Sequence, residues 1–318
     1  MNGTNRWRTR LLAVAAMLGV LTVAAADAAD RTVRVGYQKY GTFLLLKARG
    51  LLERRLAPLG YAVSWTEFPG GPQLLEALNV GALDFGVTGE APPIFAQAAG
   101  APLVYVGDEP PAPRSEAILV AKDSPLHQVT DLKGKSVALN KGSNVHYLLV
   151  RALEKAGLQY SDVKTVFLAP ADARAAFEHG SVDAWAIWDP FQASAELGLE
   201  AHTLANGEGG VAANRQFYIG ERGFVAANPA VVVALLASIG EIDEFARDHI
   251  DEAANELSPA VGIPTPVLKL ALSRQSWGVQ AMTPEVATDQ QKIADAFRSL
   301  GLIPKPIRIS DVVRAGGG

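Results

Sequence analysis

Short apolar or alternating segments, rich in β-branched and aromatic residues, recur along the first two thirds of the chain. Longer segments with apolar residues at helical spacing separate them and end at or near glycine. Strand alternating with helix predicts an α/β fold. The expected strands are residues 32–38, 62–68, 83–88, 103–107, 117–121, 136–139, 163–168 and 182–187, and the expected helices are 71–80, 91–99, 144–156 and 171–179.

From about residue 224 the pattern becomes helical. Val231, Leu235, Ile239 and Ile242 trace one apolar face, and a further helical segment covers residues 283–300. Long helices with an apolar stripe usually cover a sheet, so we expect these segments to complete the core and not to bind ligand.

Two of the predicted units look alike when the chain is shifted by 99 residues. Residues 81–93 (GALDFGVTGEAPP) then lie over residues 180–192 (GSVDAWAIWDPFQ). Each unit predicts a helix, a glycine turn, a strand and an acid just before a proline-containing helix start. The matching pairs are Gly81 with Gly180, Leu83 with Val182, Asp84 with Asp183, and Glu90 with Asp189.

The acids of these units fall at opposite ends of the strands. Asp84 and Asp183 follow the glycine turns, where an acid usually stabilises the turn. Glu90 and Asp189 follow the strands, and ligands of open parallel sheets bind beyond the carboxyl ends of the strands. We therefore expect a binding site near Glu90 and Asp189.

The N-terminus has the pattern of a secretory signal peptide over residues 1–28. Arg6, Arg8 and Arg10 precede an apolar run over residues 11–26, which is shorter than the roughly 20 residues that span a bilayer. No comparable run follows in the sequence. The sequence predicts a soluble, exported, periplasmic protein.

Charge, cysteine content and length narrow the class further. The formal charge of −4 becomes about −6 without residues 1–28, which argues against a nucleic-acid partner. The absence of cysteine excludes disulfides, iron–sulfur sites and a lipid anchor on an N-terminal cysteine. About 290 mature residues exceed the usual single-domain size, so two lobes are expected.

Enzyme motifs are absent from the sequence. Val129 stands where a phosphate-binding loop ending in residues 134–136 would need its first glycine, and no G-x-S-x-G elbow or metal-binding histidine pair occurs. We expect no cofactor and no metal. A triad or metal site assembled from distant residues is the remaining alternative.

Three kinds of candidate contact follow the strands. Tyr37 and Gln38 end the first strand. Gly142 and Ser143 lead into a helix at Asn144, where amide donors and the helix dipole could hold an anion; ordinary helix capping is the alternative.

The third kind surrounds the second acid. Trp188 ends a strand, where its ring could pack on the hydrocarbon part of a ligand, whereas Trp185 lies within the strand and is expected in the core. Glu90 and Asp189 could cap helices or touch ligand. The candidate ligand-binding residues are Tyr37, Gln38, Gly89, Glu90, Gly142, Ser143, Asn144, Trp188, Asp189 and Tyr218.

Two long runs resemble a known family. Residues 67–111 and 168–191 look like the periplasmic aliphatic-sulfonate-binding proteins of ABC importers, relatives of the taurine and nitrate binders. The resemblance is nearly continuous from residue 33 to 191 and thinner after 224. It implies a binding protein and not an enzyme. Such a binding protein takes up a sulfonate anion and delivers it to a membrane permease.

The resemblance also implies a type II periplasmic-binding-protein fold with two α/β lobes, a hinge and a central ligand cleft. The expected crossovers lie near residues 115–119 and 216–222. The first lobe then comprises residues 30–117 with 221–318, and the second comprises residues 118–220. A monomer is expected.

The sequence departs from the family in ways that leave alternatives open. Family members often carry aspartate where this chain has Glu90, and small residues where it has Asn144 and Val145. A free carboxylate would repel a sulfonate in a dry cleft, so either the acids are bound as caps or the ligand carries an ammonium group, as taurine does. The alternatives are a taurine, nitrate or other small-oxyanion binder, and an exported enzyme acting on sulfonate or sulfate esters.

Overall fold

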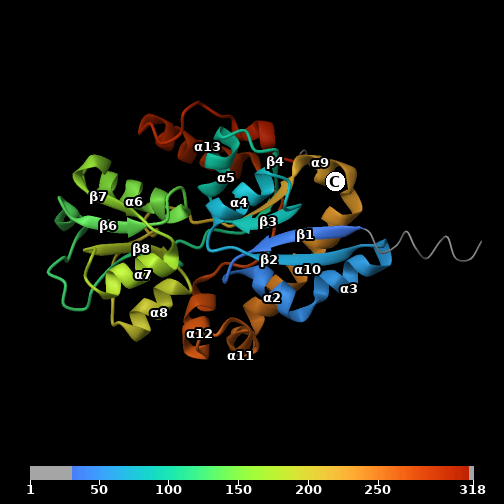
Figure 1. Ribbon diagram of the computed structural model, residues 1–318, viewed down its shortest axis with the longest axis horizontal. Helices are drawn as coiled ribbons and strands as arrows, with labels where there is room; N and C mark the ends of the chain where they lie inside the picture. Colours follow the sequence, from blue (N-terminus) through green and yellow to red (C-terminus); the bar gives the residue numbers. More distant parts are fainter. Residues whose placement is uncertain (1–30, 315–318) are drawn as a thin grey trace, which may run out of the picture.

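The computed structural model describes residues 31–314 and contains two five-stranded sheets (Figure 1). The expected signal peptide lies outside the described residues. The first sheet has the order β2-β1-β3-β10-β4, in which β1, β2 and β3 are parallel and β10 runs antiparallel to both β3 and β4. Its strands are β1 (Thr32–Tyr37), β2 (Ala62–Glu67), β3 (Phe85–Thr88), β4 (Leu103–Asp108) and β10 (Phe217–Glu221).

The second sheet repeats this arrangement with other parts of the chain. Its order is β7-β6-β8-β5-β9, with β6, β7 and β8 parallel and β5 antiparallel to both β8 and β9. Its strands are β5 (Glu116–Val120), β6 (Ser136–Leu139), β7 (Lys164–Phe167), β8 (Ala184–Trp188) and β9 (His202–Asn206). The α/β fold with two lobes is confirmed.

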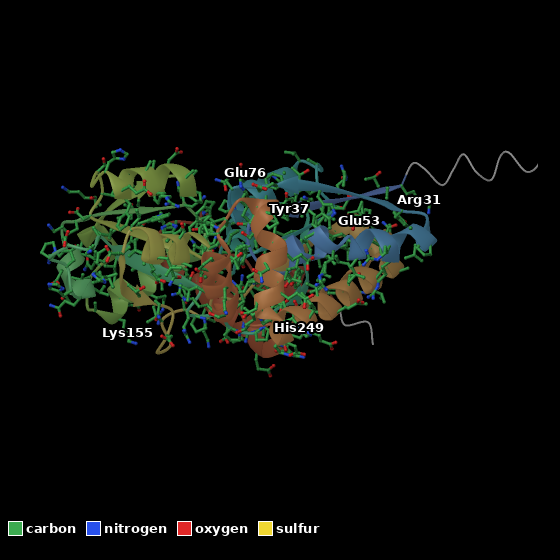
Figure 2. All side chains as sticks on the ribbon, turned by 90° about the horizontal axis from the view of Figure 1, so that it is seen from below. Arg31, Tyr37, Glu53, Glu76, Lys155 and His249 are labelled. Carbon is green, nitrogen blue, oxygen red and sulfur yellow. The ribbon has the colours of Figure 1, made fainter. Side chains whose placement is uncertain are left out.

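Helices cover both sheets, and the lobes lie end to end along the long axis of the molecule. Figure 2 shows Arg31 and Glu53 toward one end and Lys155 near the other. The first lobe carries α2 (Thr42–Arg49), α3 (Leu51–Leu56), α4 (Gly71–Asn79), α5 (Pro92–Ala98), α9 (Arg222–Ala227), α10 (Pro229–Asp248), α11 (Ile250–Val261), α12 (Thr265–Arg274) and α13 (Pro284–Ser299); the second carries α6 (Asn144–Lys155), α7 (Pro170–Glu178) and α8 (Phe191–Gly198).

The C-terminal helices complete the first lobe, as the apolar stripe predicted. Val231, Leu235, Ile239 and Ile242 of α10 are buried in one core cluster with side chains of α2 and β1. Another cluster runs from the other face of the first sheet into the second lobe. Among residues 31–314, no helix is long and apolar enough to cross a membrane.

Two short segments connect the sheets. Residues 109–115 lead from β4 to β5, and residues 207–216 lead back from β9 to β10. The boundaries expected at residues 117–118 and 220–221 fall inside β5 and β10. These residues already pair with neighbouring strands, so the connections lie a few residues earlier than the expected crossovers.

The correspondence across 99 residues is structural. Helix α4 corresponds to α7 and strand β3 to β8, with Gly81 and Gly180 between them at φ angles of 72° and 64°. That left-handed conformation favours glycine. The repeat therefore marks the same position in each lobe.

Candidate functional site: the cleft between the lobes

A cavity of about 230 Å³ lies where loops of the two lobes meet. Loops that follow β1 and β2 form one side, and residues that follow β7 and β8 form the other. The carboxyl ends of parallel strands thus converge here, as expected for a ligand crevice. The lining residues are Gln38, Lys39, Tyr40, Glu67, Phe68 and Pro69 from the first lobe, and Ala169, Pro170, Ala171, Trp188 and Phe191 from the second.

Two aromatic side chains form the second-lobe wall. Trp188 is the last residue of β8 and Phe191 the first of α8; their ring centroids lie 6.4 Å apart with the planes at 84°. Trp188 is 4% exposed. Trp185 points the other way into the core and packs on Phe177, with centroids 5.8 Å apart, as predicted. The wall is suited to a hydrocarbon chain.

The side chains at the end of β1 interact with groups of the first lobe itself. Gln38 lines the cavity, but its Nε2 donates to the Val87 carbonyl at 3.0 Å. The Tyr37 hydroxyl donates to Glu67 Oε2 at 3.2 Å. Lys39 lies 3.6 Å from Glu67 Oε1, so charge on this side of the cavity is paired.

The loop before α6 presents donors at the lobe interface. Gly142 has φ 76° and its N–H donates to His146 Nδ1 at 3.2 Å. Ser143 occupies the N-cap position, yet its hydroxyl donates to the Asn140 carbonyl at 2.7 Å and caps no helix N–H. Simple capping by Ser143 is therefore wrong, and the first-turn amides of α6 have no partner from that side chain.

Asn140 is a candidate that the sequence interpretation missed. Its Nδ2 is buried without a hydrogen-bond partner among the described residues. A Cβ added at Gly70 of the first lobe would lie only 3.0 Å from this atom. Gly70 follows Pro69 in the cavity wall, so Asn140 supplies an available donor between the lobes. Its position directly after β6 was the signal that could have found it.

Asn144 and Gly89 meet across the lobes, away from the cavity lining. The Asn144 Nδ2 donates to Glu116 Oε2 at 2.6 Å and to Asn214 Oδ1 at 2.9 Å. A Cβ at Gly89 would lie 2.8 Å from Asn144 Cγ. Glycine at position 89 thus allows the lobes to approach closely.

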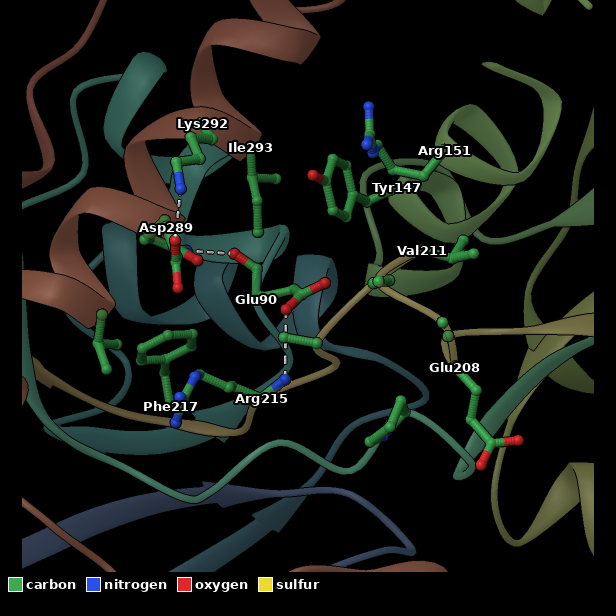
Figure 3. A pocket seen from close by; sticks show the side chains of 18 residues that line it. Glu90, Tyr147, Arg151, Glu208, Val211, Arg215, Phe217, Asp289, Lys292 and Ile293 are labelled. Carbon is green, nitrogen blue, oxygen red and sulfur yellow. Dashed lines mark hydrogen bonds and ion pairs between the residues drawn. The ribbon is translucent and has the colours of Figure 1, made fainter. Parts of the chain in front are cut away.

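Glu90 lies in a different cavity, of about 480 Å³, beside the second crossover (Figure 3). Side chains of α13, including Asp289 and Lys292, flank it on one side, and Tyr147 of α6 faces it from the other. Glu90 Oε2 accepts the Arg215 N–H at 3.3 Å, so it caps neither α5 nor another helix as expected. The capping interpretation is wrong for Glu90.

Burial determines the protonation of Glu90. The side chain is 1% exposed and Oε1 has no partner among the described residues. Desolvation raises the pKa of Glu90 to about 7, although the Arg215 N–H and charge act in the opposite direction. Burial, and after it the charge of Glu90, also raises the pKa of Glu116.

Asp189, in contrast, is fully partnered. Its Oδ1 accepts the Ala193 N–H at 2.9 Å, and both carboxylate oxygens lie 3.4 Å from Arg274 Nη1. Burial raises the pKa of Asp189 to about 6, and Arg274 opposes this shift. The capping role is confirmed, with one correction: Pro190 follows a cis peptide bond and takes the N-cap position, so α8 begins at Phe191.

Tyr218 is not brought to the cleft. It is fully buried in β10, its ring centroid lies 5.3 Å from that of Phe43, and its hydroxyl donates to Glu109 Oε1 at 2.5 Å. Among residues 31–314, no group of three or more His, Asp or Glu side chains could hold a metal ion. The cleft thus combines Gln38 and Trp188 with Tyr40, Phe68 and Phe191, three aromatic residues that were not predicted.

Two α/β lobes joined by two crossovers, with a cavity between them, define a solute-binding protein of the periplasmic-binding class. Comparison with known proteins agrees. The model of the family described as NMT1/THI5 like matches residues 62–253. The chain belongs to this family and, within it, to the aliphatic sulfonate-binding proteins. The relatives described next are named as binding proteins.

The similarity extends over most of the chain. An aliphatic sulfonates-binding protein of Escherichia coli is 46% identical over 94% of this chain and 93% of its own. The structure of the alkanesulfonate-binding protein SsuA from Xanthomonas axonopodis pv. citri bound to MOPS matches with a TM-score of 0.86 and 41% identity, covering 90% of this chain and 98% of that one. The periplasmic aliphatic sulphonate binding protein SsuA from Escherichia coli gives 0.80 and 44%, with coverage of 89% and 97%.

Proposed function

We propose that this protein captures an aliphatic sulfonate in the periplasm and delivers it to the membrane permease of an ABC importer. The proposal rests mainly on the interlobe cavity, one wall of which is formed by Trp188 and Phe191. The similar proteins are named as binders of aliphatic sulfonates or alkanesulfonates, which supports this ligand class. The leader-like pattern of residues 1–28 supports the periplasmic location.

The sulfonate headgroup is held by neutral donors in this proposal. A sulfonate is a permanent anion with three acceptor oxygens and no donor, so it requires N–H and O–H groups and no base. Asn140 Nδ2 supplies one such donor near Gly70, and we infer that free amides of the loop leading into α6 become further donors when the lobes close on the ligand. Each hydrogen bond to a charged group contributes about 1.5–3 kcal/mol, so three contacts support roughly micromolar affinity after the costs of association.

The pairing of Asp189 favours a ligand with a plain alkyl tail. Its carboxylate is neutralised by Arg274 and bound to the Ala193 N–H, which leaves no free acid beside Trp188 to receive an ammonium group. Glu90, whose Oε1 has no partner among the described residues, lines the other cavity. We therefore infer that taurine binds more weakly than an alkanesulfonate of the same length.

Ligand capture involves closure of the lobes. A ligand that contacts both lobes only when they are closed shifts the population toward the closed form. The permease then recognises the outer surface of the closed monomer. No cofactor takes part.

Calorimetric titration of the mature protein tests the proposal. We expect ethanesulfonate and butanesulfonate to bind at micromolar concentrations, taurine to bind at least about tenfold more weakly, and nitrate and sulfate to bind least, because they offer nothing to the aromatic wall. Equal affinity for sulfate and butanesulfonate would overturn the sulfonate assignment. Preference for taurine would overturn the alkyl-tail assignment alone.

A further inference from the structure

Helix α12 belongs to the first lobe but packs on both lobes. Leu268 and Leu272 are buried in the core cluster of the first lobe. Val267 and Ala271, on another face of α12, form a small apolar cluster with Ala193 of α8 in the second lobe. Figure 1 shows α12 and α8 side by side below the two sheets. The contact thus joins the lobes outside the cleft cavity.

Arg274, the last residue of α12, extends this contact with charge. Its Nη1 lies 3.4 Å from both carboxylate oxygens of Asp189, and its Nη2 pairs with Glu196 of α8. The Arg274 side chain is 11% exposed and Asp189 is 1% exposed. The guanidinium thus bridges two acids of the other lobe in a largely buried setting, where an ion pair is screened less than at the surface.

The two acids also bind groups of their own lobe. Asp189 accepts the Ala193 N–H, and Glu196 Oε1 accepts from Gln192 Nε2 at 3.1 Å and from Thr203 Oγ1 at 3.0 Å. Both acceptors are therefore in place on the second lobe, whereas their cation comes from the first. A rotation about residues 109–115 and 207–216 that separates α12 from α8 breaks the pairs and returns the charges to water.

We propose that Arg274 is a positioning residue: an interlobe clamp that forms on closure and raises ligand affinity without contacting the ligand. Asp189 directly follows Trp188, so the clamp also fixes the aromatic wall of the cavity. Its contribution enters through the closed population, because the apparent dissociation constant rises as the binding-competent fraction falls. The inference rests on the proposed capture of a ligand in this cleft.

The test compares Arg274→Gln with Arg55→Gln in the mature full chain. Arg55 pairs with Glu241 at 2.6 Å inside the first lobe, so its loss leaves the lobe contact intact. Butanesulfonate affinity is measured by calorimetry, and the open-to-closed change by small-angle scattering without ligand and at saturation. We expect Arg274→Gln to weaken binding about tenfold, to enlarge the ligand-free particle, and to close at saturating ligand. Arg55→Gln matches the unmodified protein.

Arg274→Lys supplies a second variant if the glutamine variant folds poorly. A lysine is a single point charge and cannot bridge two acids as a guanidinium does, so we expect an intermediate affinity. Equal affinities of the Arg274 and Arg55 variants overturn the clamp. If the unmodified protein binds no sulfonate, the proposed function fails instead, and the scattering of the ligand-free variants still reports on the clamp.

Discussion

The same unit of helix, glycine turn and strand occurs in both lobes: α4 with β3 in the first, and α7 with β8 in the second. The two copies are alike up to the residues at the carboxyl ends of the strands. Asp84 accepts the Arg34 N–H at 2.7 Å, and Asp183 accepts the Ser136 N–H at 2.7 Å. Each acid thereby binds the neighbouring parallel strand near its start. The role of both residues is structural, as predicted, but each acid binds the neighbouring strand and not the turn in which it lies.

The carboxyl ends of the same strands differ. The first lobe has Gly89 and Glu90, and the second has Trp188 and Asp189. Gly89 admits Asn144 from the other lobe, whereas Trp188 forms a wall of the cavity. Asp189 has an arginine partner, whereas one oxygen of Glu90 has none among the described residues. The fold fixes the amino end of the unit and leaves its carboxyl end free to specialise.

Removing the tryptophan tests the difference most strongly. Trp188→Ala deletes the ring that covers the ligand tail, so we expect sulfonate affinity to fall about 100-fold, or about 2.7 kcal/mol. Calorimetry measures the change. Trp277→Ala, a tryptophan packed on the first-lobe core, is the control and retains wild-type affinity. Unchanged binding by Trp188→Ala would show that the two strand ends do not differ in function.

Glu90→Gln tests the cost of burying an acid that has one unpartnered oxygen among the described residues. The pKa of Glu90 is about 7 in the folded protein, whereas a glutamate of the unfolded chain has a pKa near 4.5. As the pH rises, the unfolded chain therefore releases this proton first. Stability therefore declines as the pH rises from about 4.5 through 7. We expect the variant to be more stable by about 2 kcal/mol at pH 8 and nearly unchanged at pH 4.

Urea denaturation at both pH values measures this effect. Part of the decline remains in the variant because burial also raises the pKa of Glu116. A Glu90→Gln protein that is less stable at pH 8 would mean that the ionised carboxylate has a favourable partner.

Gly89→Ala adds a methyl group where the other lobe approaches. The new Cβ would lie 2.8 Å from Asn144 Cγ, so Asn144 must shift before the lobes close. We expect sulfonate affinity to fall about tenfold, which corresponds to about 1.4 kcal/mol. Gly81→Ala is a poor control because of its positive φ angle, so Ala82→Gly, at an exposed position, serves instead. If Gly89→Ala binds sulfonate as tightly as the control, closure of the lobes does not require glycine at position 89.

The smallest expected effect is a difference in stability between variants of the two structural acids, Asp84 and Asp183. Asp84 is nearly buried and also binds the Arg34 guanidinium, with Nη2 at 2.6 Å, whereas the Asp183 side chain is 40% exposed. We expect Asp84→Ala to destabilise the protein by about 1 kcal/mol more than Asp183→Ala, because the buried site loses a charged partner as well as an amide bond. Thermal unfolding of the two variants gives the comparison. Equal losses would mean that the ion pair contributes nothing measurable.

Local pattern explains what could be predicted of the fold. The eight expected strands appear within one or two residues because turns, helices or a proline-rich connection mark their ends in the sequence. β9 and β10 were missed. β10 is a short segment that follows a long connection, and its pairing partners are more than 100 residues away in the sequence. α2 was missed as well, because its apolar run over residues 43–46 lacks a clear helical stripe.

Candidate site residues were predictable as far as strand ends reveal them. Trp188 and Gln38 reach the cavity because they follow β-strands whose carboxyl ends converge. The partner of Asp189 was not predictable, since Arg274 lies 85 residues away and carries no local pattern. Nor could the sequence distinguish Glu90 from Asp189 as caps, because that difference depends on which buried N–H lies within reach.

The position of β10 has a consequence for how the chain assembles. This strand lies between β3 and β4 in the first sheet, yet it emerges only after the whole of the second lobe. Residues 116–206 form an uninterrupted insertion that holds all five strands of its own sheet. The insertion can therefore complete its backbone pairing on its own, whereas β3 and β4 each keep one unpaired edge until β10, which follows more than 100 residues later in the chain, is available.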